Sequence, residues 1–440
     1  MSAHASPTAR AVASKVLVRV VRDQSFAAAA LEAELSRVVQ LDDRDRALAT
    51  ELVYGVLRVF PWLVAQIDGR AKKPTHSLPW DAQGALWVAA QQLFFMRVPA
   101  FAAVDEAVTA VRRAAGASVA GFANALLRKL AASRPKPSEQ EALRIHARLE
   151  SCPAELRAAL DSALGQDAAH AFLSELQPPP IGLRVTHEHE RAEIMERIRT
   201  TRAHAELRLG TLSPLCINAH RLGGRLQSLP GFAEGHLSVQ EEGSQVVALS
   251  LGVRSGERVL DACAGRGNKT GVLALAGGRV DACDRDSRKL ERLDEDLARL
   301  HTSAATFAVD WLVGSGDVQG TYDAVLVDAP CSGTGTLRRR PELLLRKSRP
   351  LVERTAEQRA LVRAVVPHLK TGGRLVYAVC SVLRAEAEDV IAGLEDLLEA
   401  APFAGGGTTF VPLDATACRL LPNVHGSDGY FIASFRTRKS

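Results

Sequence analysis

The 440-residue chain lacks several patterns that would assign it to a common class. Its seven cysteines are scattered without a CxxC pair or neighbouring histidines, which argues against a zinc site and against a disulfide framework. No run of 18 apolar residues occurs, and basic residues interrupt the apolar positions near the N-terminus, so neither a membrane span nor a signal peptide is predicted. We therefore expect a cytoplasmic protein in a reducing compartment, without a membrane or metal partner.

The chain has no strong excess of charge either, because its formal net charge is only +5. A strongly basic body built for a polyanionic partner is therefore not indicated. Basic residues are nevertheless concentrated between Arg338 and Arg349, where six of them accompany one acid. Such a cluster is usually a solvated surface, but beside a catalytic loop it becomes a candidate contact for phosphate groups. We assign this contact to Arg338, Arg339, Arg340 and Arg346.

Three regions of the chain differ in their pattern of apolar residues, and a chain of this length commonly holds about three domains. Residues 1–140 show helical periodicity, and Asp42 and Asp43 can cap the start of one helix. Residues 141–232 read as a small α+β module. In residues 233–440 strands and helices alternate, which is typical of a doubly wound, mostly parallel sheet.

Short apolar runs predict the order of the elements after the helical region. In the module we expect a strand at 181–186, a helix at 189–198 and two short strands between 205 and 220. In the last region we expect strands at 258–262, 278–283, 304–309, 322–327, 373–379 and 430–435, and helices at 269–276, 287–300, 353–369 and 385–398. Ligands of such sheets bind at the carboxyl ends of the strands. The polar residues at or just past these ends are Asp284, Asp310, Asp328, Cys331 and Cys380.

The loop DACAGRGNKT follows the first strand of the predicted sheet. A glycine-containing turn at this point lets the backbone approach a ligand, and Asp284 at the end of the next strand can accept hydrogen bonds from ribose hydroxyls. This pair suits a cofactor that contains adenosine, although similar turns occur in many sheets. A phosphate-binding P-loop is the competing interpretation. It fails because Ala264 and Asn268 stand where that motif needs glycine.

The two cysteines near strand ends suggest a specific chemistry. Carbon 5 of cytosine is a poor nucleophile, and it becomes a good one when a thiolate adds to carbon 6 and an acid contacts ring nitrogen 3. Asp328, Cys331 and Cys380 supply the groups that this reaction needs. Either cysteine alone is more often a small buried apolar residue. Two of them, each just past a strand, favour the functional interpretation.

The motifs DAPCSGTG and YAVCS, which follow DACAGRGNKT in this order, resemble the catalytic core of the RNA 5-methylcytosine methyltransferases of the Sun/NOL/NOP family. The segments DRDRALATELVYGVLR, VPAFAAVDEAV and GFANALLRKL resemble the NusB-like RNA-binding domain that precedes this core in family members of the RsmB type. The resemblance implies a Rossmann-like methyltransferase domain with a mostly parallel, seven-stranded sheet, preceded by an all-α NusB-like domain and the small module.

The resemblance also implies roles for individual residues. S-adenosylmethionine is the expected methyl donor, with Cys380 as the nucleophile and Cys331 as the residue that lets the product leave. Asp284 is expected at the ribose, Asp310 near the adenine and Asp328 between the donor and the base. The remaining cofactor contacts are expected from Cys263, Ala264, Gly265, Arg266, Gly267, Asn268 and Lys269. The expected partner is small-subunit ribosomal RNA, bound by a monomer. DNA cytosine methylases attack with the cysteine of a Pro-Cys motif, so Cys380 favours RNA.

The chain departs from the family pattern at two places. The first loop of the family usually reads CAAPGGKT, whereas this chain has CAGRGNKT, with Arg266 in place of proline and Asn268 in place of glycine. Glycines 265 and 267 remain, and asparagine tolerates left-handed conformations. The segment VQEEGSQ stands where QDASAQ is usual. The altered loop leaves open an alternative, a non-catalytic RNA-binding or ribosome-assembly factor, and calorimetry with S-adenosylmethionine would distinguish the two.

Overall fold

The computed structural model describes residues 8–346, 349–404 and 415–438. The chain forms two compact units. The first comprises Met1–Asp161, Gly165–Pro178 and Leu337–Lys347, and the second comprises Ser162–Leu164, Pro179–Thr336 and Ser348–Ser440. The division into domains at residues 140 and 232 stays a prediction.

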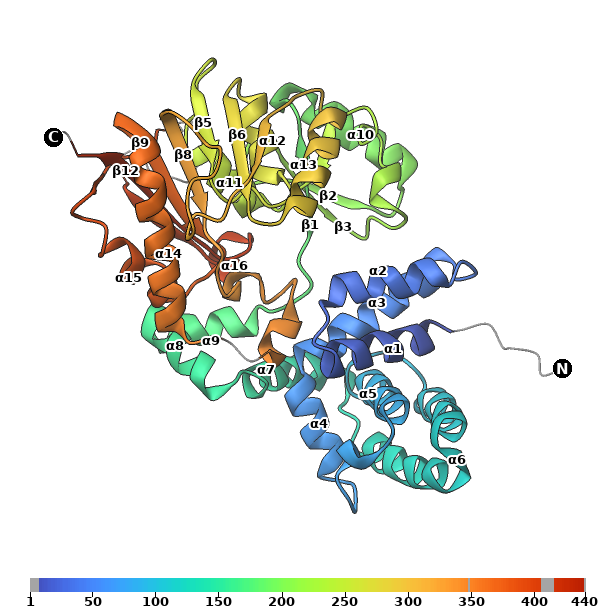
Figure 1. Cartoon of the computed structure of the whole chain (residues 1–440). Coiled ribbons are helices and arrows are strands. Elements are labelled where there is room, and N and C mark those ends of the chain that lie inside the picture. Colours follow the sequence, from blue (N-terminus) through green and yellow to red (C-terminus); the bar gives the residue numbers. More distant parts are fainter. Residues whose placement is uncertain (1–7, 347–348, 405–414, 439–440) are drawn as a thin grey trace. The chain divides into compact units, whose positions relative to one another are not determined.

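The first unit is helical, as the apolar periodicity predicts (Figure 1). The side chain of Asp42 accepts a hydrogen bond from the Asp45 backbone N–H at 2.8 Å, so the predicted helix cap is present. Nearly every residue of the fifth helix is buried, which makes it the centre of the bundle. The helices of this unit are α1 (Ala9–Arg22), α2 (Ala27–Arg37), α3 (Asp43–Arg58), α4 (Phe60–Asp68), α5 (Trp80–Phe95), α6 (Ala100–Ala132), α7 (Gln140–Glu150), α8 (Ala154–Leu164, whose last residues belong to the second unit) and α9 (Gln166–Ser174).

Among the described residues no single helix is both long and apolar enough to cross a membrane, although α3 and α4, bent by 80° at their junction, pass that criterion as a pair.

The second unit contains a small antiparallel sheet in the order β2-β3-β1-β4. Its elements are β1 (Ile181–Val185), α10 (Arg191–Thr201), β2 (Glu206–Leu209), β3 (Cys216–His220) and β4 (Leu237–Val239). The predicted strand, helix and strand pair are all present. The sequence pattern missed β4, a three-residue strand that is too short to show alternation.

The large sheet of the second unit has the order β10-β12-β9-β8-β5-β6-β7, and β11 pairs with β12 as an eighth strand (Figure 1). The five strands from β9 to β7 are parallel, and the others are antiparallel. The predicted Rossmann-like, mostly parallel fold is confirmed. The strands are β5 (Arg258–Asp261), β6 (Arg279–Asp284), β7 (Ala305–Ala308), β8 (Tyr322–Asp328), β9 (Leu369–Val379), β10 (Leu398–Ala400), β11 (Ala417–Leu420) and β12 (Tyr430–Thr437).

Helices cover both faces of this sheet. Alternate residues of β8 face opposite sides, so that Val325 and Val327 pack on the side of α14, while Ala324 and Leu326 pack on the side of α11 and α12. Both faces are therefore buried, as a parallel sheet requires. The helices are α11 (Glu242–Ser250), α12 (Asn268–Leu275), α13 (Ser287–Arg299), α14 (Leu351–Val365), α15 (Glu388–Ile391) and α16 (Pro422–His425).

Two predicted helices of this region have the wrong extent. The helix predicted at 353–369 ends at Val365, because Pro367 cannot donate a backbone hydrogen bond and Leu369 already begins β9. The helix predicted at 385–398 is wrong for most of its length. The chain forms a single turn at Arg384–Glu386 and the four-residue α15, and Ala387 between them leaves the helical conformation with φ −118° and ψ −100°.

Candidate active site at the carboxyl edge of the large sheet

The parallel strands bring most of the predicted site residues to one edge of the large sheet. Asp284 and Asp328 end β6 and β8, and Cys380 directly follows β9. Asp328 pairs with Ala378 in the ladder between β8 and β9, so the two strands end at nearly the same level. The loop after β8 thus lies beside the end of β9.

The two cysteines that the sequence singles out are in contact. The Sγ atom of Cys331 lies 3.3 Å from the Sγ atom of Cys380, and both side chains are half-buried. Backbone bonds hold the two loops together: the Gly335 N–H donates to the Cys380 carbonyl at 3.0 Å, and the Ala329 N–H donates to the Ala378 carbonyl at 2.9 Å. The hydrogen bond to Cys380, together with burial, raises the pKa of the Cys331 thiol well above its usual value. Cys331 is therefore a protonated thiol at neutral pH.

An ion pair lies close to these thiols. Lys269, in the first turn of α12, places its Nζ atom 2.6 Å from an Asp328 carboxylate oxygen, and the lysine side chain is only 13% exposed. Burial lowers the pKa of Lys269, but the charge and hydrogen bond of Asp328 outweigh it and leave that pKa above the ordinary lysine value. The sequence predicts Lys269 as a cofactor contact. The structure also makes it the partner of Asp328.

Tyr430 and Asp428 also belong to this site, and neither is a site residue that the sequence predicts. The Tyr430 ring lies 5.9 Å from the Lys269 ammonium group, and continuing the register of β12 and β9 by one residue puts Tyr430 opposite Cys380. The Asp428 N–H donates to Glu241 at 2.8 Å. Burial, followed by the charge of Glu241, raises the Tyr430 pKa well above its usual value, so its hydroxyl stays protonated. Their position depends on strand order, which the motifs do not specify.

The acidic segment VQEEGSQ has a structural explanation. Glu241 caps α11 by accepting a hydrogen bond from the Ser244 N–H at 3.0 Å. The carboxylate of Glu242 is buried and accepts from the Leu212 N–H at 2.6 Å and from the Asn218 side chain at 2.8 Å. Glu241, which also accepts from the Asp428 N–H just before β12, connects α11 to the large sheet. Glu242 connects α11 to the small sheet through Asn218 of β3.

The loop after β5 keeps the glycines that its conformation needs. Gly265 and Gly267 have φ angles of 59° and 82°, and a side chain at Gly267 would collide with Leu293. Arg266 and Asn268, the two departures from the family pattern, are both exposed. Asn268 is the first residue of α12, so its tolerance of a left-handed conformation is not used. The departures therefore leave the backbone of the loop intact.

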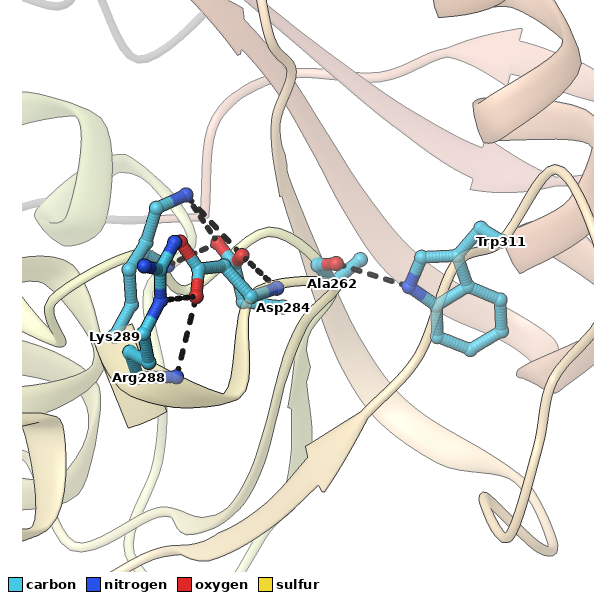
Figure 2. A network of polar contacts seen from close by, with 7 residues as sticks. Ala262, Asp284, Arg288, Lys289 and Trp311 are labelled. Atoms are coloured by element: carbon cyan, nitrogen blue, oxygen red, sulfur yellow. Dashed lines mark hydrogen bonds and ion pairs between the residues drawn. The ribbon is translucent and has the colours of Figure 1, made fainter. Parts of the chain in front are cut away.

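Asp284 is the most heavily bonded of the predicted cofactor residues, as Figure 2 shows. Its carboxylate accepts hydrogen bonds from the backbone N–H groups of Gly265 at 3.0 Å and Asp286 at 2.9 Å. The Lys289 ammonium group lies 3.2 Å from both of its oxygens. A carboxylate has about four acceptor positions, and these contacts occupy them. A ribose hydroxyl can therefore bind Asp284 only if Lys289 moves aside. The lysine side chain is 45% exposed and has room to do so.

The loop after β7 carries Asp310 and a buried tryptophan. Asp310 is exposed, and its side chain accepts a hydrogen bond from the Leu312 N–H at 3.1 Å. The Trp311 indole N–H donates to the Ala262 carbonyl at 2.9 Å (Figure 2). Trp311 therefore connects this loop to the end of β5. The sequence analysis did not single it out.

The residues at this edge fit an adenosine-containing methyl donor. The glycine loop, the strand-end acid Asp284 and the exposed Asp310 follow one another across β5, β6 and β7. Asp261 is fully buried at the end of β5, and its Oδ1 atom has no hydrogen-bond partner among the described residues. An unpaired buried acceptor at a ligand loop is expected where a ligand supplies the donor.

The predicted RNA-contacting arginines belong to the first unit. Arg338 is only 6% exposed, and its carbonyl accepts a hydrogen bond from Arg58 at 2.9 Å. Arg340 and Arg346 place their guanidinium groups 5.1 and 3.7 Å from the ring centre of Phe26, which is 45% exposed. Arg339, Arg340 and Arg346 are half-exposed, so the predicted RNA contact is more accessible at these three residues than at Arg338. Lys347, within the same basic run, lies outside the described residues.

The parallel sheet, the glycine loop after its first strand and the acids at its strand ends define a Rossmann-like methyltransferase. Comparisons with known proteins specify the family. The family described as 16S rRNA methyltransferase RsmB/F matches residues 248–436, and the NusB family matches residues 7–132. The chain belongs to the RsmB family of ribosomal RNA small subunit methyltransferases, which use S-adenosylmethionine.

Individual relatives match nearly the whole chain. Ribosomal RNA small subunit methyltransferase B of Pectobacterium atrosepticum is 31% identical, with 96% of this chain and 97% of the relative covered. The protein of the same name from Yersinia pestis is 32% identical, with the same coverage. The crystal structure of PH0851 has a TM-score of 0.78 at 22% identity, and the match covers 97% of this chain and 98% of that structure. This last likeness concerns the fold alone.

Proposed function

We propose that this chain transfers a methyl group to carbon 5 of a cytosine in small-subunit ribosomal RNA, through a covalent bond between the cytosine and Cys380. The observation that carries the proposal is the 3.3 Å contact between Cys331 and Cys380. Two thiols at the ends of neighbouring parallel strands give one nucleophile and one proton donor. A methyltransferase acting on an oxygen or nitrogen atom needs neither.

In the proposed reaction the Cys380 thiolate adds to carbon 6, which makes carbon 5 electron-rich. The Lys269 and Asp328 pair offers a donor and an acceptor to the edge of the base. Cytosine presents there an acceptor at nitrogen 3 and a donor at its amino group, so the pair matches it. S-adenosylmethionine supplies the methyl group that carbon 5 receives.

Release of the product requires that the carbon 5 proton leaves and that the bond between carbon 6 and sulfur breaks. We assign both proton movements to Cys331. Its thiol proton passes to the departing Cys380 sulfur, which keeps the electron pair of the broken bond, and the Cys331 thiolate so formed takes the proton from carbon 5. The raised pKa of Cys331 supports this order, because the residue begins as a thiol. Cys380 returns its extra proton to solvent before the next turnover.

The first unit supplies the surface that holds the RNA in this proposal. Its match to the NusB family and the half-exposed Arg339, Arg340 and Arg346 support this role. Phe26, whose ring two of these arginines contact, is 45% exposed and offers an aromatic surface to an unpaired base. Recognition of RNA through single-stranded bases commonly combines aromatic and arginine planes in this way.

The reaction is tested with Cys380→Ala and Cys331→Ala variants, small-subunit RNA and labelled S-adenosylmethionine. We expect Cys380→Ala to transfer no methyl group and Cys331→Ala to accumulate a covalent protein–RNA adduct that resists denaturing electrophoresis. Cys418→Ala is the matched control, because this cysteine lies in β11 and has neither sulfur contact nor assigned role. Normal turnover by the Cys380→Ala variant would contradict the proposal.

The alternative of a non-catalytic RNA-binding factor rested on the altered loop. The catalytic function is supported by the loop, in which Arg266 and Asn268 are exposed and both glycines keep their left-handed conformation. Titration calorimetry with S-adenosylmethionine distinguishes the two functions. Absence of binding at millimolar donor concentration would favour the factor.

A further inference from the structure

Glu386 is a buried acid that contacts the loops of both cysteines. It ends the turn Arg384–Glu386, shortly after Cys380, and it is 0% exposed. No motif of the sequence analysis includes it. Its position in a turn rather than in a helix directs its side chain beneath the Cys331 loop.

The carboxylate of Glu386 holds the residue after Cys331. One oxygen accepts a hydrogen bond from the Ser332 backbone N–H at 2.8 Å, and the other accepts from the Ser332 hydroxyl. Gln358 completes the arrangement, since its amide donates to the Pro330 carbonyl at 2.9 Å and to Glu386 at 3.3 Å. The peptide groups on both sides of Cys331 are thus held by one buried pair of side chains.

The same arrangement extends to the Cys380 loop. The hydroxyl of Ser332 lies 3.3 Å from that of Ser381, which in turn lies 3.0 Å from the Thr334 hydroxyl. The Tyr377 hydroxyl donates to the backbone carbonyl of Glu386 at 2.7 Å. A shift of Glu386 would therefore change the relative position of the two sulfur atoms.

We propose that Glu386 is a positioning residue for Cys331, holding its sulfur against Cys380 and, by its negative charge, keeping Cys331 in the thiol form until the product leaves. This inference rests on the proposed cysteine mechanism. It assigns to Glu386 two separable contributions, one of geometry and one of charge.

The choice of an acid at this place supports a contribution of charge. Every hydrogen bond to the Glu386 carboxylate comes from a neutral donor, and none of the described lysine or arginine side chains pairs with it. Burying a carboxylate without a cation costs more than burying an amide of the same size. Glutamine would avoid that cost, but its amide nitrogen could not accept a hydrogen bond from Ser332, so the acid serves both the geometry and the charge.

The other titratable groups near Cys331 do not cancel this charge. Cys380 contacts the thiol directly, and Tyr377 on β9 has a pKa that burial, followed by the charges of Cys331 and Glu386, raises well above its usual value. The ammonium group of Lys269 at this edge of the sheet is engaged by Asp328. The negative charge of Glu386 acts in the same direction as Cys380 and burial, all of which raise the pKa of Cys331.

Three substitutions separate the two contributions in the full-length protein. Glu386→Gln keeps the size but removes the charge and one of the two acceptor oxygens, whereas Glu386→Asp keeps the charge and both oxygens and shortens the reach. Asp389→Asn is the matched control, because the side chain of this nearby acid is 47% exposed and pairs with Arg384 at 3.1 Å. Circular dichroism and thermal melting establish that each variant is folded.

The first readout is the rate at which iodoacetamide alkylates each cysteine, measured by peptide mass spectrometry over a range of pH without RNA. We expect Glu386→Gln to lower the pH midpoint for alkylation of Cys331 by about one unit while Cys380 is unchanged. Glu386→Asp should keep the midpoint near its wild-type value. The second readout is the lifetime of the protein–RNA adduct, which we expect both variants to lengthen by about tenfold.

The outcomes distinguish this inference from the proposed function. If Cys331→Ala traps no adduct, the cysteine mechanism fails, and the alkylation midpoints still report whether Glu386 controls Cys331. If Cys331→Ala traps the adduct while Glu386→Gln matches the wild-type midpoint and lifetime, the role of Glu386 is wrong. A Glu386→Gln protein that does not fold, beside a Glu386→Asp protein with wild-type behaviour in both readouts, would also overturn it.

Discussion

The Lys269 ammonium group lies 2.6 Å from the Asp328 carboxylate, and this contact joins the glycine loop after β5 to the cysteine loop after β8. The two residues are far apart in the sequence: Lys269 lies in the first turn of α12, after β5, and Asp328 ends β8, the strand that pairs with β5. Because one loop is assigned to the methyl donor and the other to the cytosine, this ion pair connects the two halves of the proposed reaction.

Substitution of Lys269 by methionine should reduce methyl transfer by about a hundredfold, because the base edge loses its donor and Asp328 loses its partner. Asp328→Asn should have a similar effect, and the double variant should be little worse than either single one. Single-turnover assays with RNA and labelled donor measure this. Additive losses in the double variant would show that the two residues act independently.

Asp284→Ala should weaken binding of S-adenosylmethionine by about tenfold or more, since it removes the carboxylate that we expect to bond the ribose hydroxyls. Lys289→Met should leave binding unchanged or strengthen it, because Lys289 competes for the same oxygens (Figure 2). Titration calorimetry gives both affinities. Weaker binding by Lys289→Met would mean that the lysine contacts the donor itself.

The stability of the protein should depend on the ionisation of Asp261. Burial raises the pKa of this carboxyl from 3.8 to about 6. Between these values the folded protein keeps a proton that the unfolded chain releases, so stability falls as the pH rises through this window and is flat above it. The effect is on the order of 3 kcal/mol at most.

Asp261→Asn removes the pH dependence of stability that Asp261 causes. The asparagine keeps a side-chain oxygen for the Thr270 hydroxyl, which donates to Asp261 at 2.7 Å. Relative to the wild type, the variant should therefore gain stability between pH 4 and pH 7, as urea denaturation at each pH would measure. Parallel pH profiles for the two proteins would contradict the assignment.

The arginine and phenylalanine cluster of the first unit should contribute to RNA affinity. Phe26→Ala should weaken binding by about tenfold without changing its salt dependence, because stacking involves no phosphate. Arg346→Ala should weaken binding and reduce the slope of log K against log salt by about one. Filter binding at several salt concentrations measures both.

Arg349→Ala is the control for this cluster. Arg349 lies in the same basic run, but it pairs with Glu357 at 2.6 Å and should affect RNA binding less. Equal losses for Arg346→Ala and Arg349→Ala would point to a general effect of positive charge rather than to the contact with Phe26.

Predictions that depend on local periodicity are reliable in this chain. The helices of the first unit and the alternation of strands and helices after residue 233 follow from the spacing of apolar residues, which each segment carries by itself. The error at residues 385–398 shows the limit of such reasoning. There the backbone leaves the helical conformation at Ala387, and the buried Glu386 bonds Ser332, a contact with a distant segment that no neighbouring residue signals.

Short buried strands and the residues that end them are local features, so the α/β class, the two cysteines and the acids at strand ends can be predicted from the residues of each segment. Which of these groups meet depends on the folded chain. The Lys269 and Asp328 pair, the buried Glu386 under Cys331, Tyr430 beside Cys380 and the burial of Arg338 all join distant segments. Strand order and packing create such contacts, and neither is written in the residues of a single segment.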